Sequence, residues 1–141
     1  MKDETCLCID LRTAAHALTH LYDQAMAGSG ISVTQFSQLH LIRSFENPTL
    51  KMLADASQLD RSTLGRNIRV LERLGLVGME VGEDARTRTI HLTRKGHDTY
   101  KRAAPLWHGV QTRLLDRLGL DGRNQLDRLL TTLTAPLTAT E

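Results

Sequence analysis

Three arginines follow one another along residues 60–74 at the three- and four-residue spacing of an α-helix. At about 100° per residue, Arg66, Arg69 and Arg73 fall with Ser62 inside a sector of about 60°. A sector about 120° wide on the opposite side is apolar and carries Leu64, Ile68, Leu71 and Leu74. The segment therefore predicts a helix that buries its leucine face and offers a row of guanidinium groups to a partner.

The residue types on the exposed face are those that recognise duplex DNA. An arginine can donate two hydrogen bonds to O6 and N7 of guanine, and Asn67 could pair with N6 and N7 of adenine. Ser62 and Thr63, near the start of the helix, suit contacts to phosphates or bases. The alternative is a surface helix with solvated arginines. We favour DNA, because Glu72 is the only acid in the helix after Asp60 and internal ion pairing is therefore scarce.

Two further arginines belong to a predicted β-hairpin. Arg86 and Arg88 flank its polar tip at residues 81–86. Basic side chains placed there could enter a narrow minor groove, where the potential is strongly negative. We expect Asp84 to hold the Arg86 guanidinium through a charged hydrogen bond, which would lower its ordering cost. A generic charged turn is the alternative.

Helical periodicity, turn residues and chain breakers predict the elements that position these arginines. Helices are expected at 6–27, 34–45, 49–56, 60–74 and 93–118, with a last helix from 121, and strands at 76–80 and 87–92. We expect Thr34 and Asp60 to cap the helices that they begin. Gly75 and Gly119 are placed to end the helices before them, and Pro105 predicts a bend inside the long helix.

A short helix, a tight turn, a second helix and a hairpin together make a winged helix-turn-helix unit. We therefore predict a mainly α fold with a small β-hairpin wing, as a single domain over residues 1–141. Residues 31–92 would form the DNA-binding lobe, flanked by helices at 5–27 and 93–139. The flanking helices carry long apolar stripes that a small winged lobe cannot cover alone, which favours a homodimer.

Charge is unevenly distributed along the chain. Residues 61–102 hold ten Lys or Arg and five acids, a net charge of +5, whereas the whole chain is +2. A basic centre between neutral or acidic flanks fits a polyanionic partner, although a solvated basic face would look the same. The sequence contains neither a membrane-length apolar run nor a signal peptide, so we expect the protein in the cytoplasm.

The hairpin and the helix after it carry a spaced motif. It reads Asp84, one residue, Arg86, five residues, Leu92-Thr93, two residues and Gly96. This spacing resembles the wing signature D-x-R-x5-L-T-x2-G of the multiple antibiotic resistance regulator (MarR) family. Residues 59–64 and 71–77 resemble the recognition helix and first wing strand of that family, and the resemblance covers nearly the whole chain.

The resemblance implies an obligate homodimer that binds a pseudo-palindromic operator, usually as a repressor released by a small-molecule or oxidant effector. It places the dimer interface on residues 5–27 and 93–139. The major-groove contacts carried over by position are Ser62, Thr63, Arg66, Asn67 and Arg69. Arg86 would enter the minor groove with Asp84 orienting it, while Arg73 and Arg88 are candidates for further DNA contacts. We expect no cofactor and no metal.

Cys6 and Cys8 are the only cysteines, and both belong to the first turn of the first predicted helix, with Thr5 as its N-cap. The helix dipole there would favour thiolates, although the nearby acids oppose it. Residues two apart on a helix point about 200° apart, so oxidation to sulfenic acid or a bond to a partner chain fits better than a disulfide between them. The resemblance narrows here to a subgroup with Cys-Leu-Cys, and some family members sense oxidants through thiols. We prefer two buried thiols that pack at the dimer interface.

His16 and His20 stand one helical turn apart and make half of a metal site, which His40 or His108 would have to complete. With Tyr22 and Trp107 they could instead line an effector pocket, since the resemblance implies phenolic effectors bound between the dimer helices and the DNA-binding lobe. Ordinary packing or solvent exposure is the alternative that we favour for all four.

Two other functions compete with DNA binding. A winged helix can serve as a protein-interaction module that never touches DNA, but an acidic or apolar exposed face would then be expected in place of the arginines. An enzyme would need a catalytic constellation, and the sequence contains no nucleophile elbow, phosphate loop or metal-protease motif. We therefore expect a regulator and not an enzyme.

Overall fold

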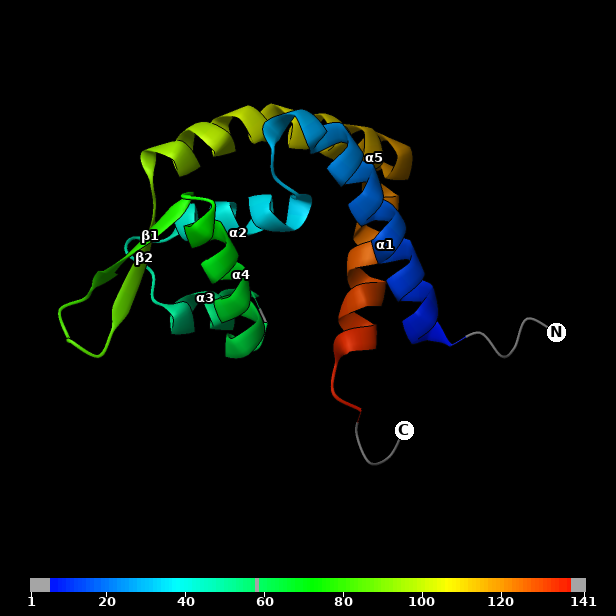
Figure 1. The fold of residues 1–141 in the computed structure, drawn as a ribbon. Coiled ribbons are helices and arrows are strands. Elements are labelled where there is room, and N and C mark those ends of the chain that lie inside the picture. Colours follow the sequence, from blue (N-terminus) through cyan, green and yellow to red (C-terminus); the bar gives the residue numbers. More distant parts are fainter. Residues whose placement is uncertain (1–5, 58, 138–141) are drawn as a thin grey trace. The chain divides into compact units, whose positions relative to one another are not determined.

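The computed structural model describes residues 6–57 and 59–137 (Figure 1). Its elements are α1 (Leu7–Met26), the 3₁₀ turn η1 (Ala27–Ser29), α2 (Val33–Ser44), α3 (Leu50–Ser57), α4 (Arg61–Arg73), β1 (Val77–Val81), β2 (Arg88–Leu92) and α5 (Arg94–Thr134). The described residues fall into two compact units, divided after Trp107. The predicted class, mainly α with one small hairpin, is confirmed.

The first two helices begin at residues that differ from the predicted caps. α1 begins after Cys6, which takes the N-cap position without a side-chain hydrogen bond, while Thr5 lies outside the described residues. α2 is capped by Ser32: its hydroxyl accepts the Gln35 N–H at 3.2 Å, and the Gln35 side chain accepts the Ser32 N–H at 3.0 Å. This reciprocal pair satisfies two N–H groups at the helix start. The prediction of Thr34 as the cap was wrong, because Thr34 lies inside the helix.

The helix-turn-helix consists of α3 and α4, and α4 begins and ends with the predicted chemistry. Asp60 caps the helix and accepts the Thr63 N–H at 2.8 Å. Gly75 follows the helix with φ 74°, and Leu76 donates its N–H to the Leu71 carbonyl at 2.9 Å. This hydrogen-bond pattern is a Schellman turn, which requires a left-handed residue and therefore favours glycine.

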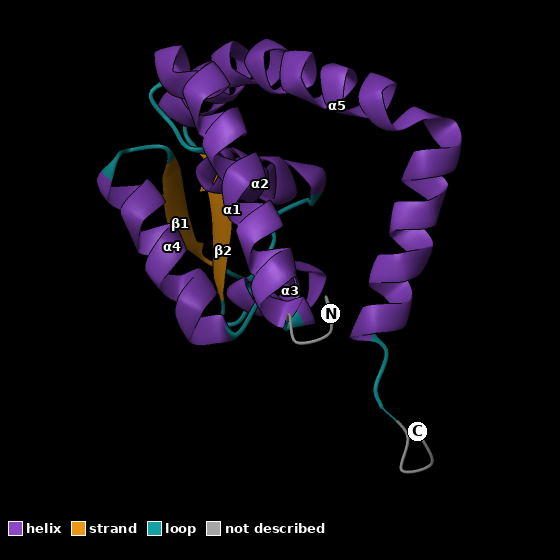
Figure 2. Cartoon of the chain, turned by 90° about the vertical axis from the view of Figure 1, so that its right-hand side faces the viewer, coloured by secondary structure: helices purple, strands orange, loops and turns teal. Residues whose placement is uncertain are grey.

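Strands β1 and β2 pair antiparallel and form the wing (Figure 2). Their register runs from Val77 opposite Leu92 to Val81 opposite Arg88. The hairpin is also tied to the loop between α2 and α3, since Ile90 donates its N–H to the Pro48 carbonyl at 2.8 Å. The base of the wing is thus fixed to the helix-turn-helix, and the arginine-bearing tip extends from a rigid support.

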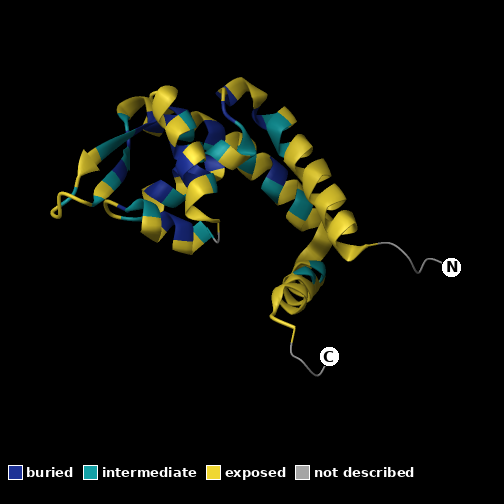
Figure 3. Cartoon of the chain, turned by 60° about the horizontal axis from the view of Figure 1, so that its bottom comes forward, coloured by how far each residue is buried: buried dark blue, intermediate teal, exposed yellow. Residues whose placement is uncertain are grey.

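The core of the first unit gathers on the inward faces of α2, α3, α4 and the hairpin (Figure 3). Its largest fully buried apolar side chains include Met26, Leu39, Leu53, Leu64, Ile68, Leu71 and Ile90. The predicted leucine face of α4 is confirmed except for Leu74, which is 42% exposed. Leu74 is the C-cap, where the chain leaves the helix for the Schellman turn, so the helical period no longer sets the direction of its side chain.

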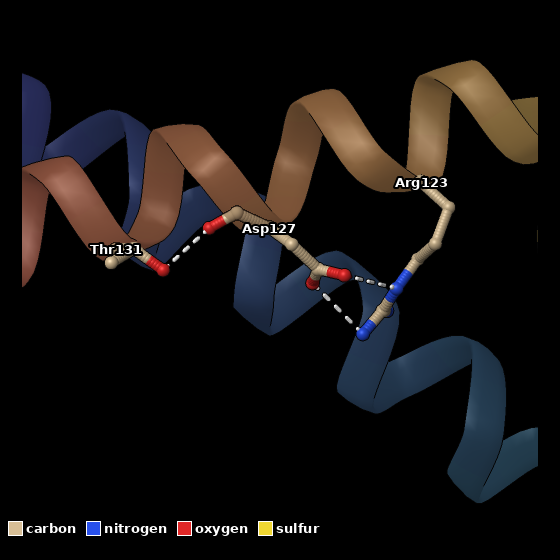
Figure 4. A network of polar contacts seen from close by, with 3 residues as sticks. All are labelled: Arg123, Asp127 and Thr131. Carbon is tan, nitrogen blue, oxygen red and sulfur yellow. Dashed lines mark hydrogen bonds and ion pairs between the residues drawn. The ribbon is translucent and has the colours of Figure 1, made fainter.

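α5 continues through Pro105 and is interrupted farther along. We expected a bend at Pro105, but the backbone leaves helical angles only at Gly119, with φ 68° and ψ 170°. Beyond Gly119, the Arg123 guanidinium pairs with the Asp127 carboxylate at 2.9 Å, and the Thr131 hydroxyl donates to the Asp127 carbonyl (Figure 4). Within the described ranges, no helix combines the length and apolar character needed to cross a membrane.

Candidate nucleic-acid interface

α4 places the residues that were predicted to contact DNA on one side of the first unit. Its exposed members are Ser62, Arg66, Arg69 and Arg73, and its half-buried members are Thr63 and Asn67. On the opposite face, Leu64, Ile68 and Leu71 are at most 1% exposed. The burial of these three side chains fixes the rotation of the helix about its axis, and the arginine row is turned outward as a consequence.

The arginines of α4 are not neutralised within the part of the chain that the structure describes. Glu72, the acid within the same helix, is exposed and forms no ion pair with a described residue. The ion pair found among residues 6–57 and 59–137 joins Arg123 to Asp127 in the second unit. The guanidinium groups of Arg66, Arg69 and Arg73 therefore keep their full charge toward a partner.

Asp60 organises the start of α4. Its carboxylate accepts the Ser62 hydroxyl at 2.6 Å, and both the hydroxyl and the N–H of Thr63 at 2.8 Å. These hydrogen bonds hold the pKa of Asp60 well below its usual range, and the bond from Ser62 contributes most to that shift. Thr63 Oγ1 in turn accepts a hydrogen bond from Nη2 of Arg66 at 3.3 Å. A network of polar contacts thus runs from an ionised carboxylate to the first arginine of the row.

The wing presents Arg86 and Arg88 as exposed side chains, but Asp84 acts differently from our expectation. Its Oδ1 accepts the backbone N–H of Arg86 at 3.0 Å, and no ion pair with the Arg86 guanidinium is found among the described residues. An aspartate readily bonds the N–H two residues ahead of it, which makes an Asx turn. In the free protein the carboxylate therefore fixes the backbone of the tip and leaves the guanidinium unpaired.

The end of α4 is held by the first turn of α5, a contact that the sequence interpretation missed. Thr93 Oγ1 donates to the Gly75 carbonyl at 2.6 Å, and Lys95 Nζ donates to the Leu74 carbonyl at 2.8 Å. The same Thr93 hydroxyl accepts the Gly96 N–H at 3.0 Å, so Thr93 also caps α5. The motif L-T-x2-G contained these residues, but their role depends on two segments meeting in space.

Both cysteines lie at the start of α1 and are exposed. Cys6 is the N-cap residue and Cys8 follows in the first turn. Within a single chain neither thiol is buried, so the packing that we prefer for them requires a second chain and stays a prediction.

His16 and His20 were considered as half of a metal site, with packing or solvent exposure as the favoured alternative. His16 and His20 are exposed on α1, and His16 lines an open hollow of about 580 Å³ together with Ile9 and Arg12. Among the described residues, no three His, Cys, Asp or Glu side chains come close enough to hold a metal ion.

Tyr22 and Trp107 come together, in a larger aromatic stack that the sequence did not reveal. Their ring centroids are 6.4 Å apart, and burial raises the pKa of Tyr22. The Phe36 ring stacks with the rings of both Trp107 and Tyr100, at centroid distances of 5.6 Å and 5.0 Å. His40 completes the group, with Nδ1 2.8 Å from the Tyr100 hydroxyl oxygen. The stack joins α1, α2 and the start of α5 within the first unit.

A helix-turn-helix whose arginine face forms no ion pair with a described residue, followed by a hairpin wing that carries two exposed arginines, defines the winged helix-turn-helix class. A model of the MarR family matches residues 29–87. The chain is also similar to the M. tuberculosis transcriptional regulator MosR in its crystal structure with DNA. That similarity has 37% identity and a TM-score of 0.80, and it covers 92% of this chain and 96% of the other. The chain therefore belongs to the MarR family.

Two further structures resemble the chain over a similar length. A second crystal structure of M. tuberculosis MosR shares 36% identity and a TM-score of 0.76, and covers 94% of this chain and 96% of the other. The transcriptional repressor CouR, bound to a 23-mer DNA duplex, shares 26% identity and a TM-score of 0.80, and covers 92% and 93%. No curated protein sequence matches the chain significantly.

Proposed function

We propose that this protein is a homodimeric transcriptional regulator that binds a specific duplex operator and represses a nearby operon. The observation that carries the proposal is the unpaired arginine row of α4, held outward by a buried leucine face. Three guanidinium groups that form no ion pair with a described residue, on a helix that follows a tight turn, match the major-groove docking of this class. The DNA complexes of MosR and CouR support the same conclusion by analogy.

The residues proposed to contact DNA divide between the two grooves. The major-groove set is Ser62, Thr63, Arg66, Asn67, Arg69 and Arg73. Arg86 and Arg88 would approach the minor groove from the wing, with Asp84 keeping the tip in shape. Because phosphates supply much of the affinity, we expect binding to weaken steeply as salt is raised.

Dimerisation would use helices on both sides of the DNA-binding lobe. Under this proposal the lobe spans residues 31–92, and the dimer helices span 5–27 and 93–139. Apolar side chains left uncovered in one chain support this, among them Leu7 at 63% exposed and Leu120 at 78%. A two-fold partner would set the two α4 helices about 34 Å apart, one turn of DNA.

Release from the operator would follow binding of a small molecule or oxidation. The exposed thiols of Cys6 and Cys8, within a Cys-Leu-Cys sequence, are the candidates for the oxidant. The aromatic stack around Tyr22 and Trp107, with His16 and His20 on the same helix as Tyr22, is the candidate region for a small molecule. A protein with this task works on chromosomal DNA, so we place it in the cytoplasm and assign it no enzymatic activity.

The proposal is tested by fluorescence anisotropy on duplexes that tile the promoter beside the protein's own gene. We expect specific, salt-dependent binding, and a loss of about 1–3 kcal/mol for Arg66→Ala or Arg69→Ala where that residue reads a base. Arg128→Ala removes an exposed positive charge from α5, outside the basic segment 61–102, and is the control that should bind normally. Operator affinity retained by the Arg66→Ala/Arg69→Ala variant would contradict the assignment. Footprinting with and without oxidant then tests release.

A further inference from the structure

The hydroxyl protons of Ser62 and Thr63, at the start of α4, already form hydrogen bonds within the protein. Ser62 Oγ and Thr63 Oγ1 both donate to the Asp60 carboxylate, at 2.6 and 2.8 Å. A serine or threonine hydroxyl has one proton to donate and two lone pairs that accept. With their protons engaged, the two hydroxyls face outward as acceptors only. A phosphate oxygen also only accepts, so neither hydroxyl can bind one without first breaking its bond to Asp60.

Asp60 cannot relax this arrangement by taking up a proton. The hydrogen bonds that it accepts hold its pKa well below the usual range, so it stays ionised at neutral pH. Its charge also occupies the positive end of the α4 dipole, where a phosphate would otherwise be favoured. The residue thus disfavours a phosphate at this end of α4 and fixes the direction of the hydrogen bonds around it.

Thr63 uses one of its accepting lone pairs on Arg66. The Arg66 Nη2 atom lies 3.3 Å from Thr63 Oγ1, whereas Arg69, one turn along the same face, forms no hydrogen bond to another described side chain. A guanidinium has five N–H groups, so Arg66 keeps donors for a base after this contact. Holding one nitrogen in the free protein reduces the rotamer entropy that Arg66 would lose on binding.

We propose that Asp60 determines base specificity without touching DNA: through Thr63 it positions Arg66 to donate to guanine, and through Ser62 it presents an acceptor for a base amino group. In the major groove that amino group is N4 of cytosine or N6 of adenine. The inference rests on the proposed function and names the recognition chemistry of the same α4 face. This inference refines the role of Thr63 within the major-groove set: Thr63 acts as a positioning residue through Arg66, and not through a DNA contact of its own.

A double-mutant cycle separates positioning from direct contact by Thr63. An operator selected by the wild-type dimer from a randomised duplex library is titrated with Thr63→Val, Arg66→Gln and the double variant. We expect Thr63→Val to weaken binding by about three- to tenfold, and to add almost nothing once Arg66 is Gln. Thr63→Ser, which restores the hydroxyl, should recover the affinity. Equal losses from Thr63→Val in both backgrounds would overturn the positioning role.

Asp60→Asn tests the polarity of the face while keeping a good N-cap. The variant should fold with wild-type helicity, since asparagine caps as well as aspartate. We expect the affinity of this variant for non-specific duplex to rise and the salt dependence of its binding to steepen. Its preference for a base that carries an amino group should weaken, and Ser62→Ala should weaken the same preference. A base preference unchanged at every position would overturn the proposal. Absence of any sequence-specific binding by the wild type would overturn the proposed function as well, so the two failures are distinguishable.

Discussion

Gly96, in the first turn of α5, lies so close to the carbonyl of Leu76 that a β-carbon on Gly96 would overlap the oxygen. The obstacle is backbone and cannot rotate away. Around this contact, Thr93 and Lys95 bond the last carbonyls of the α4 turn. The absence of a side chain at Gly96 therefore allows the start of α5 to pack directly on the chain that leaves the recognition helix.

Gly96→Ala should destabilise the protein although alanine is the better helix former. Overpacking against a rigid backbone costs about 1–3 kcal/mol, which outweighs a propensity gain of about 1 kcal/mol. Gly109→Ala is the matched control in the same helix, because nothing lies within 4 Å of the point where its β-carbon would stand. Urea unfolding followed by circular dichroism should show opposite signs for the two variants, and a stabilised Gly96→Ala would refute the packing argument.

Removal of the Thr93 hydroxyl should loosen the junction of α4 and α5. Thr93→Ala loses the N-cap of α5 and the bond to the Gly75 carbonyl together, with an expected cost of about 1–2 kcal/mol. Hydrogen exchange should quicken at the end of α4 as well as at the start of α5, because one hydroxyl serves both. Thr112→Ala, an exposed position within α5, is the control. Exchange changes confined to α5 would show that Thr93 is only a local cap.

The wing offers a test of how Asp84 works. Its carboxylate bonds the Arg86 backbone N–H, and an asparagine oxygen can accept the same bond. We therefore expect Asp84→Asn to bind DNA within about twofold of wild type, whereas Asp84→Ala should lose several-fold because the tip is no longer ordered. Anisotropy titrations on one operator measure both. Equal losses for the two variants would indicate that the negative charge matters, as it would if Asp84 held the guanidinium in the complex.

The lowered pKa of Asp60 predicts that the protein loses stability at acidic pH. Its pKa is lower in the folded state, so the unfolded chain binds a proton more readily as the pH falls below about 4. The stabilisation is therefore complete above that pH and is lost as the pH falls further. Asp60→Asn does not titrate at this site. The difference in Tm between wild type and Asp60→Asn should shrink from pH 5 to pH 2, with Asp116→Asn as the reference. A difference in Tm that stays constant between pH 5 and pH 2 would contradict the lowered pKa of Asp60.

Local chemistry was enough to predict most of the elements that carry the proposed site. The start of α4 at Asp60 and its end at Gly75 follow from short-range capping and backbone preferences, and both were predicted correctly. The N-cap of α2 could also have been predicted from the sequence, because Ser32 and Gln35 form a capping box three residues apart. Leu74 was misplaced because the helical period was continued one residue past the point where the helix ends.

The sequence alone thus determined the helix that carries the arginines, the side of that helix that is apolar, and the hairpin after it, since each depends on neighbours within a few residues. Only the tertiary structure decided that Thr93 bonds Gly75, that Tyr100 bonds His40 and that Gly96 fits beneath Leu76. These pairs are separated by 18, 60 and about 20 residues, and no periodicity connects them. They form because burial of the shared core brings distant segments together, and the polar atoms at those junctions must then find partners.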